Sequence, residues 1–223
     1  MLLLGIDTCG ATGTVALARC EDGKLTPLAQ TELPGKTYSA RLVPTIRDLG
    51  AAHNVAMSGL GAIVVTRGPG SFTGIRIGLA TAKGLAEADA IPILAVSRLA
   101  VLAHKAETRA AALDASRGEF YFGDFSAAPP AEHLLTRDQF HGPAAGLGPH
   151  LAVCETTILL VAPAATLVPP PDAVDAFRFA LPRLGTRDFD DPLLLDGNYI
   201  RRSDAEIFSS PGAPPRPYSK PPA

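Results

Sequence analysis

Three strand-like segments follow one another at the start of this chain before any helical pattern occurs. They cover residues 2–7, 14–18 and 25–33. The pair Asp22-Gly23 separates the last two segments, and an Asp-Gly pair is typical of a tight hairpin turn. Strands joined by such short turns pair with antiparallel neighbours, because a parallel pair needs a long crossover. The opening therefore predicts a meander of three antiparallel strands.

Helical and strand-like segments alternate after this opening. Apolar residues recur at helical spacing between positions 42 and 49. A β-branched strand at 62–66, a proline-free helix at 72–88 and a strand at 91–96 are expected next, and Ser97 is placed to cap a further helix. A meander followed by alternating helices and strands predicts an α/β fold, with helices packed on a mixed sheet.

The second half of the chain is richer in proline, since 16 of the 21 prolines follow Ser126. The elements expected there are strands at 110–113, 119–125 and 157–161, and a helix that begins at Asp172. We therefore predict an N-terminal lobe at 1–104, a smaller lobe at 105–208 and a proline-rich, disordered tail at 209–223.

Composition excludes several classes of protein. Apolar residues make up 47% of the chain, charged residues make up 19%, and the net charge is −2. This balance excludes a wholly disordered chain. It also argues against a nucleic-acid binder that acts alone, although not against a subunit whose partner carries the basic surface. The N-terminus is unlike a signal peptide, and no apolar run is long enough for a membrane span. We expect a cytoplasmic protein without membrane association.

Cysteine and histidine spacing predicts no metal site. The three cysteines are Cys9, Cys20 and Cys154, and the widely spaced histidines of the second half are His133, His141 and His150. No C-x-x-C or H-x-x-x-H pattern occurs among them, and an odd number of cysteines favours a reducing compartment. A serine hydrolase is also disfavoured, because no G-x-S-x-G sequence is present.

A glycine-rich segment at 67–78 follows an expected strand and opens an expected helix. Glycines before a helix N-terminus let a phosphate approach the backbone, so a nucleotide-binding loop is one interpretation. The segment departs from G-x-G-x-x-G at Thr73, and it lacks the G-K-[ST] of a Walker loop. The favoured alternative is a tight turn in which Ser71 or Thr73 caps the helix.

Small residues form a stripe along the helix expected at 72–88. Gly74, Gly78 and Ala82 lie four residues apart and therefore on one face. Each interior glycine costs about 1 kcal/mol relative to alanine, so a close approach of another backbone is expected. That backbone belongs either to the chain's own sheet or to a helix of another chain. Arg76 and Lys83 would form the polar rim of this stripe.

Two acids end expected strands. Asp7-Thr8 precedes a glycine-containing hairpin, and Asp114 precedes the turn Ser116-Arg117-Gly118. This is the layout of phosphate-binding turns in the actin-like ATPase architecture, where two acids face each other across a magnesium nucleotide. The second turn looks degenerate, and no later glycine-rich adenosine loop follows. We interpret Asp7, Thr8 and Asp114 as a degenerate nucleotide-binding site. The alternative is that the two acids only cap turns.

Five segments together resemble the TsaB (YeaZ) family, whose members are needed to place threonylcarbamoyl on the adenosine beside the anticodon of tRNAs that read ANN codons. The most specific resemblance lies in GPGSFTGIRIG at 68–78, and the weaker ones are at 4–8, 39–46, 114–121 and 199–201. The chain departs from the family pattern at Tyr38, where histidine is usual, and at Gly197, where proline is usual. Residues 126–170 have no match.

The resemblance implies an actin-like (ASKHA, ribonuclease H-like) fold with two lobes, of which the second is reduced. It implies a catalytically silent subunit that binds TsaD, the related metal- and nucleotide-binding transferase, and TsaE, a P-loop ATPase, joins the complex. Such proteins pair with themselves when alone, and they meet tRNA only through the complex. No tightly bound cofactor is expected, only weak ATP or ADP at the interface with TsaD.

The small-residue stripe and the resemblance together predict a face for TsaD on the first two helices. Its residues are Leu42, Ile46, Gly70, Ser71, Phe72, Thr73, Gly74, Arg76, Gly78, Ala82 and Lys83. One alternative is an active ATPase or sugar kinase that uses Asp7 and Asp114. An M22-type (glycoprotease-like) peptidase is a second alternative, disfavoured because no metal pair or nucleophile is visible.

Overall fold

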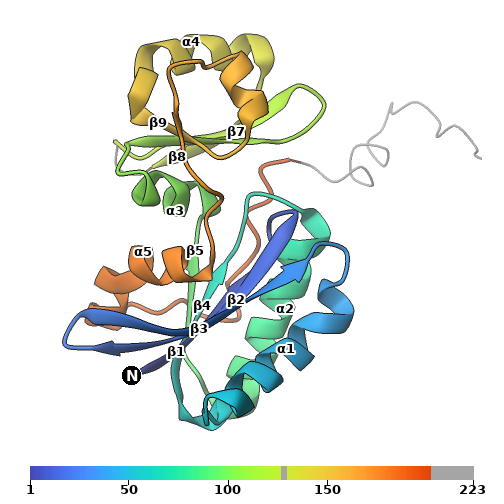
Figure 1. Ribbon diagram of the computed structural model, residues 1–223, viewed down its shortest axis with the longest axis vertical. Helices are drawn as coiled ribbons and strands as arrows, with labels where there is room; N and C mark the ends of the chain where they lie inside the picture. Colours follow the sequence, from blue (N-terminus) through green and yellow to red (C-terminus); the bar gives the residue numbers. More distant parts are fainter. Residues whose placement is uncertain (127–129, 202–223) are drawn as a thin grey trace, which may run out of the picture.

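Two sheets form the two lobes of the computed structural model, which describes residues 1–126 and 130–201 (Figure 1). The first sheet has the order β3-β2-β1-β4-β5. Its strands are β1 (Leu2–Asp7), β2 (Thr12–Glu21), β3 (Lys24–Pro34), β4 (Leu60–Thr66) and β5 (Ile93–Val96). The first three strands are antiparallel neighbours, whereas β1, β4 and β5 run parallel. The predicted meander is thus confirmed.

Helices cover both faces of the first sheet. α1 (Tyr38–Ala52) and α2 (Phe72–Asp89) lie side by side on one face, and α5 (Ala173–Thr186) covers the other (Figure 1). Alternate residues of β4 contribute to two cores: Ile63 and Val65 pack toward α1 and α2, and Val64 packs toward α5. Burial on both sides explains why this strand is a continuous apolar run.

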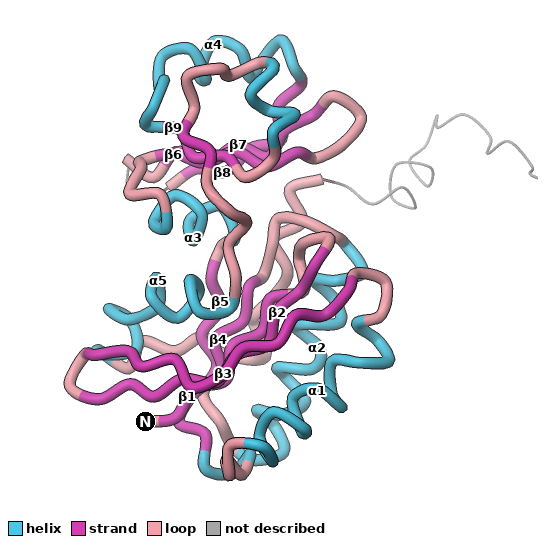
Figure 2. The backbone as a smooth tube through the Cα atoms, viewed as in Figure 1, coloured by secondary structure: helices cyan, strands magenta, loops and turns pink. Residues whose placement is uncertain are grey.

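The second lobe is built on a sheet of order β10-β9-β6-β7-β8. Its strands are β6 (Ala110–Asp114), β7 (Glu119–Asp124), β8 (Ala131–Thr136), β9 (Leu151–Val153) and β10 (Thr166–Leu167). α4 (Arg137–Leu147) covers the outer face, and α3 (Arg98–Lys105) lies on the face toward the first lobe (Figure 2). The described 3-10 helices are η1 (Met57–Gly59), η2 (Gly148–His150) and η3 (Thr156–Leu160).

The strand predicted at 157–161 is wrong, because residues 157–160 lie in η3 and Val161 follows it directly. The Ile158 amide donates to the Glu155 carbonyl, and the Val161 amide donates to the Ile158 carbonyl. These short-range bonds turn the chain before Pro163. Ile158 alone of this apolar run is fully buried, and Leu160 is 79% exposed.

The boundary of the second lobe at 105–208 also needs correction, because α5 belongs to the first lobe. Phe177 is fully buried in the core cluster that includes Leu3 and Val64 of the first sheet. Beyond α5, Asp190 pairs with Ile93 at the edge of β5. The chain therefore leaves the first lobe once, builds the second sheet and returns.

The tail predicted at 209–223 lies outside the described residues. Over 1–126 and 130–201, no helix combines the length and the hydropathy that crossing a membrane requires.

Candidate functional site

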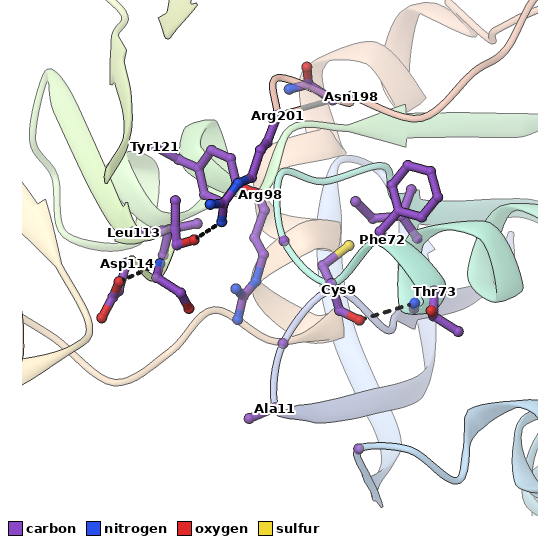
Figure 3. A pocket seen from close by; sticks show the side chains of 18 of the residues that line it. Cys9, Ala11, Phe72, Thr73, Arg98, Leu113, Asp114, Tyr121, Asn198 and Arg201 are labelled. Carbon is purple, nitrogen blue, oxygen red and sulfur yellow. Dashed lines mark hydrogen bonds between the residues drawn. The ribbon is translucent and has the colours of Figure 1, made fainter. Parts of the chain in front are cut away.

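A cavity of about 1090 Å³ opens between the two lobes (Figure 3). The first lobe supplies the turn after β1 and the loop before α2, and the second supplies the turn between β6 and β7. The start of α3 and the segment 198–201 complete the wall. A cavity of this size is large enough for a small-molecule ligand.

The glycine-rich loop lies directly against the turn after β1. The Ser71 amide donates a hydrogen bond of 2.8 Å to the Cys9 carbonyl. A Cβ at Gly70 would collide with the same carbonyl, so this position has no room for a side chain. The Ser71 hydroxyl accepts a hydrogen bond from the Gly74 amide at 3.2 Å. Ser71 is therefore the helix cap, and Thr73 is not.

The small-residue stripe of α2 faces the chain's own first strand. The Thr8 hydroxyl donates to the Gly74 carbonyl at 2.7 Å. A Cβ at Gly74 would collide with the Thr8 carbonyl, and one at Gly78 would collide with the Thr8 hydroxyl. Ala82 is fully buried. The prediction that these three residues contact a partner helix is wrong, because Thr8 occupies the space beside Gly74 and Gly78 and because Ala82 lies in the core of the first lobe.

Leu42 and Ile46 of α1 are core residues as well. They are 1% and 2% exposed, and they pack in the cluster between α1, α2 and the sheet. Their assignment to the partner face is wrong, since an amphipathic helix directs its apolar stripe toward its own core. Val43, the next residue after Leu42, is 57% exposed and marks the outward side of α1.

An aromatic–arginine cluster lies at the start of α2 and comprises Phe72, Arg76 and Tyr199. Phe72 and Tyr199 also line the cavity, and Arg76 is exposed. The rings of Phe72 and Tyr199 have centroids 4.8 Å apart, and the Arg76 guanidinium carbon lies 3.9 Å from the Phe72 centroid. Sequence reasoning missed Tyr199 here, because no local pattern links position 199 to position 72. The predicted partner residues that reach the surface at least in part are Gly70, Ser71, Phe72, Thr73, Arg76 and Lys83.

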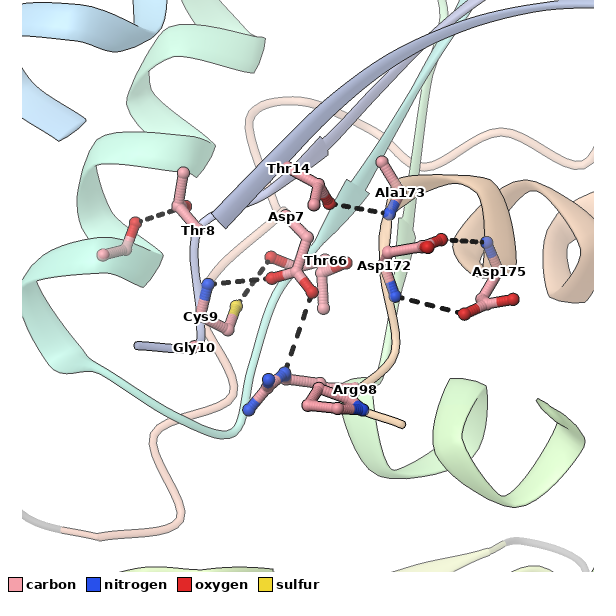
Figure 4. A network of polar contacts seen from close by, with 12 residues as sticks. Asp7, Thr8, Cys9, Gly10, Thr14, Thr66, Arg98, Asp172, Ala173 and Asp175 are labelled. Atoms are coloured by element: carbon pink, nitrogen blue, oxygen red, sulfur yellow. Dashed lines mark hydrogen bonds and ion pairs between the residues drawn. The ribbon is translucent and has the colours of Figure 1, made fainter. Parts of the chain in front are cut away.

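Asp7 is buried and lies beside Cys9 and Arg98 (Figure 4). Its Oδ1 accepts a hydrogen bond from the Cys9 amide at 2.8 Å, and its Oδ2 lies 3.7 Å from Nε of Arg98. Burial raises the pKa of Asp7, and the Arg98 guanidinium opposes that shift. Thr8, the other residue of the predicted phosphate turn, is occupied by its bond to Gly74.

Asp114 is bonded to its own turn and to η3. Its carboxylate accepts from the Ser116 amide at 2.7 Å and from the Thr157 hydroxyl at 3.2 Å. Among the described residues that line the cavity, Asp114 is present and Asp7 is not. The two carboxylates therefore do not face each other across this cavity. The ranges 1–126 and 130–201 hold no group of three or more His, Cys, Asp or Glu side chains suited to a metal ion.

Sequence reasoning also missed the residues that connect the lobes. Glu132 of β8 accepts hydrogen bonds from the Ser97 hydroxyl, at the start of α3, and from the Asn198 side-chain amide. Arg201 forms an ion pair of 2.8 Å with Glu119 of β7. The resemblance at 199–201 marked this segment, but it assigned no role to it.

Arg98 is a further cavity residue that sequence reasoning missed. It is 7% exposed, although charged side chains are rarely buried so deeply. Its only signal in the sequence is its position, as one arginine between the apolar runs at 91–96 and 99–103.

Comparison with known proteins agrees with the resemblance. A family model described as TsaD, tRNA N6-adenosine threonylcarbamoyltransferase, matches residues 31–153. The tRNA threonylcarbamoyladenosine biosynthesis protein TsaB of Escherichia coli is 36% identical over 131 residues, which cover 56% of this chain and 55% of that protein. TsaB of Bacillus subtilis is 42% identical over 129 residues, with coverage of 55% and 54%. The chain spans about half the length of these curated relatives.

Two solved structures from Pseudomonas aeruginosa are similar over most of this chain. One, described as an uncharacterized protein with similarity to peptidase YEAZ, has a TM-score of 0.73 and 28% identity, and covers 90% of this chain and 99% of that one. The other, YeaZ, has a TM-score of 0.68 and 26% identity, with coverage of 89% and 99%. The predicted two-lobed, actin-like α/β fold is thus confirmed. Since the TsaD family model matches more than half of the chain and the named relatives are TsaB and YeaZ proteins, this chain belongs to the TsaB (YeaZ) family.

Proposed function

We propose that this chain is a non-catalytic subunit of the complex that transfers threonylcarbamoyl to the adenosine beside the anticodon of ANN-decoding tRNAs, and that it acts by binding TsaD. The observation that carries the proposal is its identity of 36% and 42% to proteins named for tRNA threonylcarbamoyladenosine biosynthesis. TsaE joins this complex in the cytoplasm. This chain associates with tRNA only as part of the complex. Without TsaD, two copies of this chain pair through the same face.

The proposal gives this chain no catalytic residue. An ATPase or kinase would need Asp7 and Asp114 on one cavity, whereas Asp7 is enclosed and Asp114 is bonded to its own turn. A thiol peptidase would need a reactive thiolate. The cavity residue Cys9 is disfavoured in that role, because burial raises the pKa of its thiol well above the usual range. ATP or ADP binds weakly at most, at the interface with TsaD.

The face for TsaD is the outward side of α1 and α2, with the aromatic–arginine cluster as its anchor. Arginine and large aromatic residues dominate the binding energy of many interfaces. The guanidinium of Arg76 lies within cation–π distance of Phe72, so these two side chains already contact each other in the isolated chain. Val43 adds exposed apolar surface on α1.

Mixing this chain with TsaD from the same organism tests the proposal. Size exclusion with light scattering is expected to show a one-to-one complex, and calorimetry gives its affinity. Arg76→Glu should weaken the complex at least about tenfold, because it reverses the charge of an interface anchor. Arg137→Glu, the same change at the exposed start of α4, should leave the affinity unchanged.

Two results would contradict the proposal at different levels. If the folded natural chain forms no complex with TsaD, the proposed function is wrong. If Arg76→Glu binds as tightly as the natural chain, the function stands and the face lies elsewhere.

A further inference from the structure

The guanidinium of Arg98 lies in the wall of the cavity between the lobes, at the side next to Asp7, which we call the cavity floor. Its positive charge is only partly balanced by the Asp7 carboxylate. The Arg98 side chain is 9% exposed and belongs to the cavity lining (Figure 3). Its Nε has no hydrogen-bond partner among the described residues, and it lies 3.7 Å from Oδ2 of Asp7, beyond hydrogen-bond distance. Burying a guanidinium is costly unless it is both paired and hydrogen-bonded. Asp7 therefore compensates Arg98 only in part.

The terminal nitrogens of Arg98 have no hydrogen-bond acceptor among the residues 1–126 and 130–201. Within the described part of the chain, Asp7 is its only ion-pair partner, and neither Nη1 nor Nη2 donates a hydrogen bond. Gly10 leaves the room for this group, since a Cβ there would lie 2.7 Å from Nη2. A guanidinium presents its N–H groups as a planar fork that matches the oxygens of a phosphate. The N–H groups of Nη1 and Nη2 thus remain available to a ligand.

The first turn of α2 lines the same cavity. Ser71, Thr73 and the backbone of Gly74 form part of its wall. A helix N-terminus carries a partial positive charge that attracts anions. The helix end and the buried guanidinium therefore favour the same kind of ligand, and they are independent of each other.

Both signs of charge occur around the cavity. The basic residues besides Arg98 are Lys36, Arg117 and Arg201, and the acidic ones are Asp114 and Glu155. Asp114 is already hydrogen-bonded to its own turn. Glu155 is the acid that opposes an anion in this space, because it is half-buried and its Oε2 accepts no hydrogen bond from the part of the chain that the structure describes.

We propose that the cavity floor binds a phosphate group on the Arg98 guanidinium without a divalent cation. Arg98 lies beside Asp7 (Figure 4), and Arg98 lines the cavity whereas Asp7 does not. Arg98 therefore supplies the positive charge that a metal ion supplies in a site built on two carboxylates. The ligand is a phosphate-bearing small molecule, and a cavity of about 1090 Å³ accommodates more than the phosphate alone. This inference does not depend on the binding of TsaD.

Calorimetric titration of the full chain with inorganic phosphate, pyrophosphate and ADP tests the proposal, each first in EDTA and then with excess Mg²⁺. We expect at least one of the three to bind in EDTA, Mg²⁺ not to strengthen that binding, and added salt to weaken it. Binding of inorganic phosphate would show that one phosphate group is sufficient. Binding of pyrophosphate but not phosphate would show that two are needed, and binding of ADP alone would show that the nucleoside is needed. Lack of binding by the folded chain in EDTA, or binding that requires Mg²⁺, would overturn the proposal.

Variants assign the binding to Arg98. Arg98→Lys keeps a positive charge beside Asp7 but removes the planar set of guanidinium N–H donors. It should weaken phosphate binding at least about tenfold. If Arg98→Lys does not fold, the double variant Asp7→Asn/Arg98→Gln removes both buried charges together and should lose the binding. Arg47→Gln, at an exposed position on α1, is the matched control and should bind as the natural chain does.

Glu155→Gln tests the same site through an expected increase in phosphate affinity. It leaves Arg98 intact and removes a negative charge from the cavity, so the affinity for phosphate should rise. Unchanged affinity in folded Arg98→Lys, or weaker affinity in Glu155→Gln, would show that the phosphate does not sit on Arg98.

Discussion

The Thr8 hydroxyl donates a hydrogen bond of 2.7 Å to the Gly74 carbonyl and joins the end of β1 to the first turn of α2. This contact requires glycine at two positions, because a Cβ at Gly74 or at Gly78 would collide with Thr8. Thr8 is fully buried, so no water can replace a lost partner. The two glycines of the stripe are therefore requirements of the fold rather than of an interface.

Gly78→Ala should destabilise the protein by about 1–3 kcal/mol, because its Cβ needs space that the Thr8 hydroxyl holds. Gly84→Ala in the same helix is the matched control. No atom of the described residues lies within 4 Å of the added Cβ there, so the higher helix propensity of alanine should stabilise the protein by up to about 1 kcal/mol. Urea unfolding followed by circular dichroism measures both. Effects of the same sign would contradict the proposed packing.

Because α5 returns to the first lobe, the stability of that lobe is predicted to depend strongly on Phe177. Phe177→Ala should cost about 3–5 kcal/mol, since it removes a fully buried aromatic ring. Phe179→Ala, two residues on and only partly buried, should cost clearly less. Denaturant unfolding of the two variants gives the comparison. If Phe177→Ala were as mild as Phe179→Ala, α5 would not be part of this core.

The first lobe was predictable from the sequence because its local patterns agree with its tertiary packing. The helix expected at 72–88 is observed as Phe72–Asp89, and Ser71, Ser97 and Asp172 cap helices. The unmatched region 126–170 lacks such agreement. α4 contains Gly142 and Pro143, which lower helix propensity, yet it forms around its fully buried Phe140.

The sequence of that region contains one indication of a helix start that the predictions from local patterns did not use. Thr136 and Gln139 have the spacing of a capping box, and the structure contains both of its hydrogen bonds. The contacts of the candidate site had no such signal. The pairing of Arg98 with Asp7, and that of Tyr199 with Phe72, join positions far apart in the chain, so only the folded structure reveals them.

Glu132 is predicted to hold the segment 198–201 in place. It accepts hydrogen bonds from Ser97 and Asn198, so Glu132→Ala leaves two half-buried donors unpaired. Hydrogen exchange measured by mass spectrometry should become faster in 198–201 and at the start of α3. His133→Ala, at the exposed neighbouring position, should leave exchange there unchanged. If both variants exchange alike, Glu132 does not link the lobes.

The environment of the Tyr38 hydroxyl predicts that the protein loses stability at alkaline pH. Its hydroxyl donates to the Gly10 carbonyl at 2.9 Å, and burial raises the pKa of Tyr38 from 10 to about 12. Above pH 10 the unfolded chain releases this proton while the folded chain keeps it. The folded state then binds more protons, so stability falls as the pH rises from 10 to about 12.

Tyr38→Phe separates this effect from other alkaline transitions. At neutral pH the variant should lose about 0.5–1.5 kcal/mol, which is the contribution of one hydrogen bond. Between pH 10 and 12 its stability should fall less steeply than that of the natural chain, because phenylalanine has no proton to release. Denaturant unfolding at several pH values measures both slopes, and phenolate absorbance of the folded chain gives the pKa directly. Equal slopes would show that Tyr38 ionises alike in both states, which would contradict its burial against Gly10.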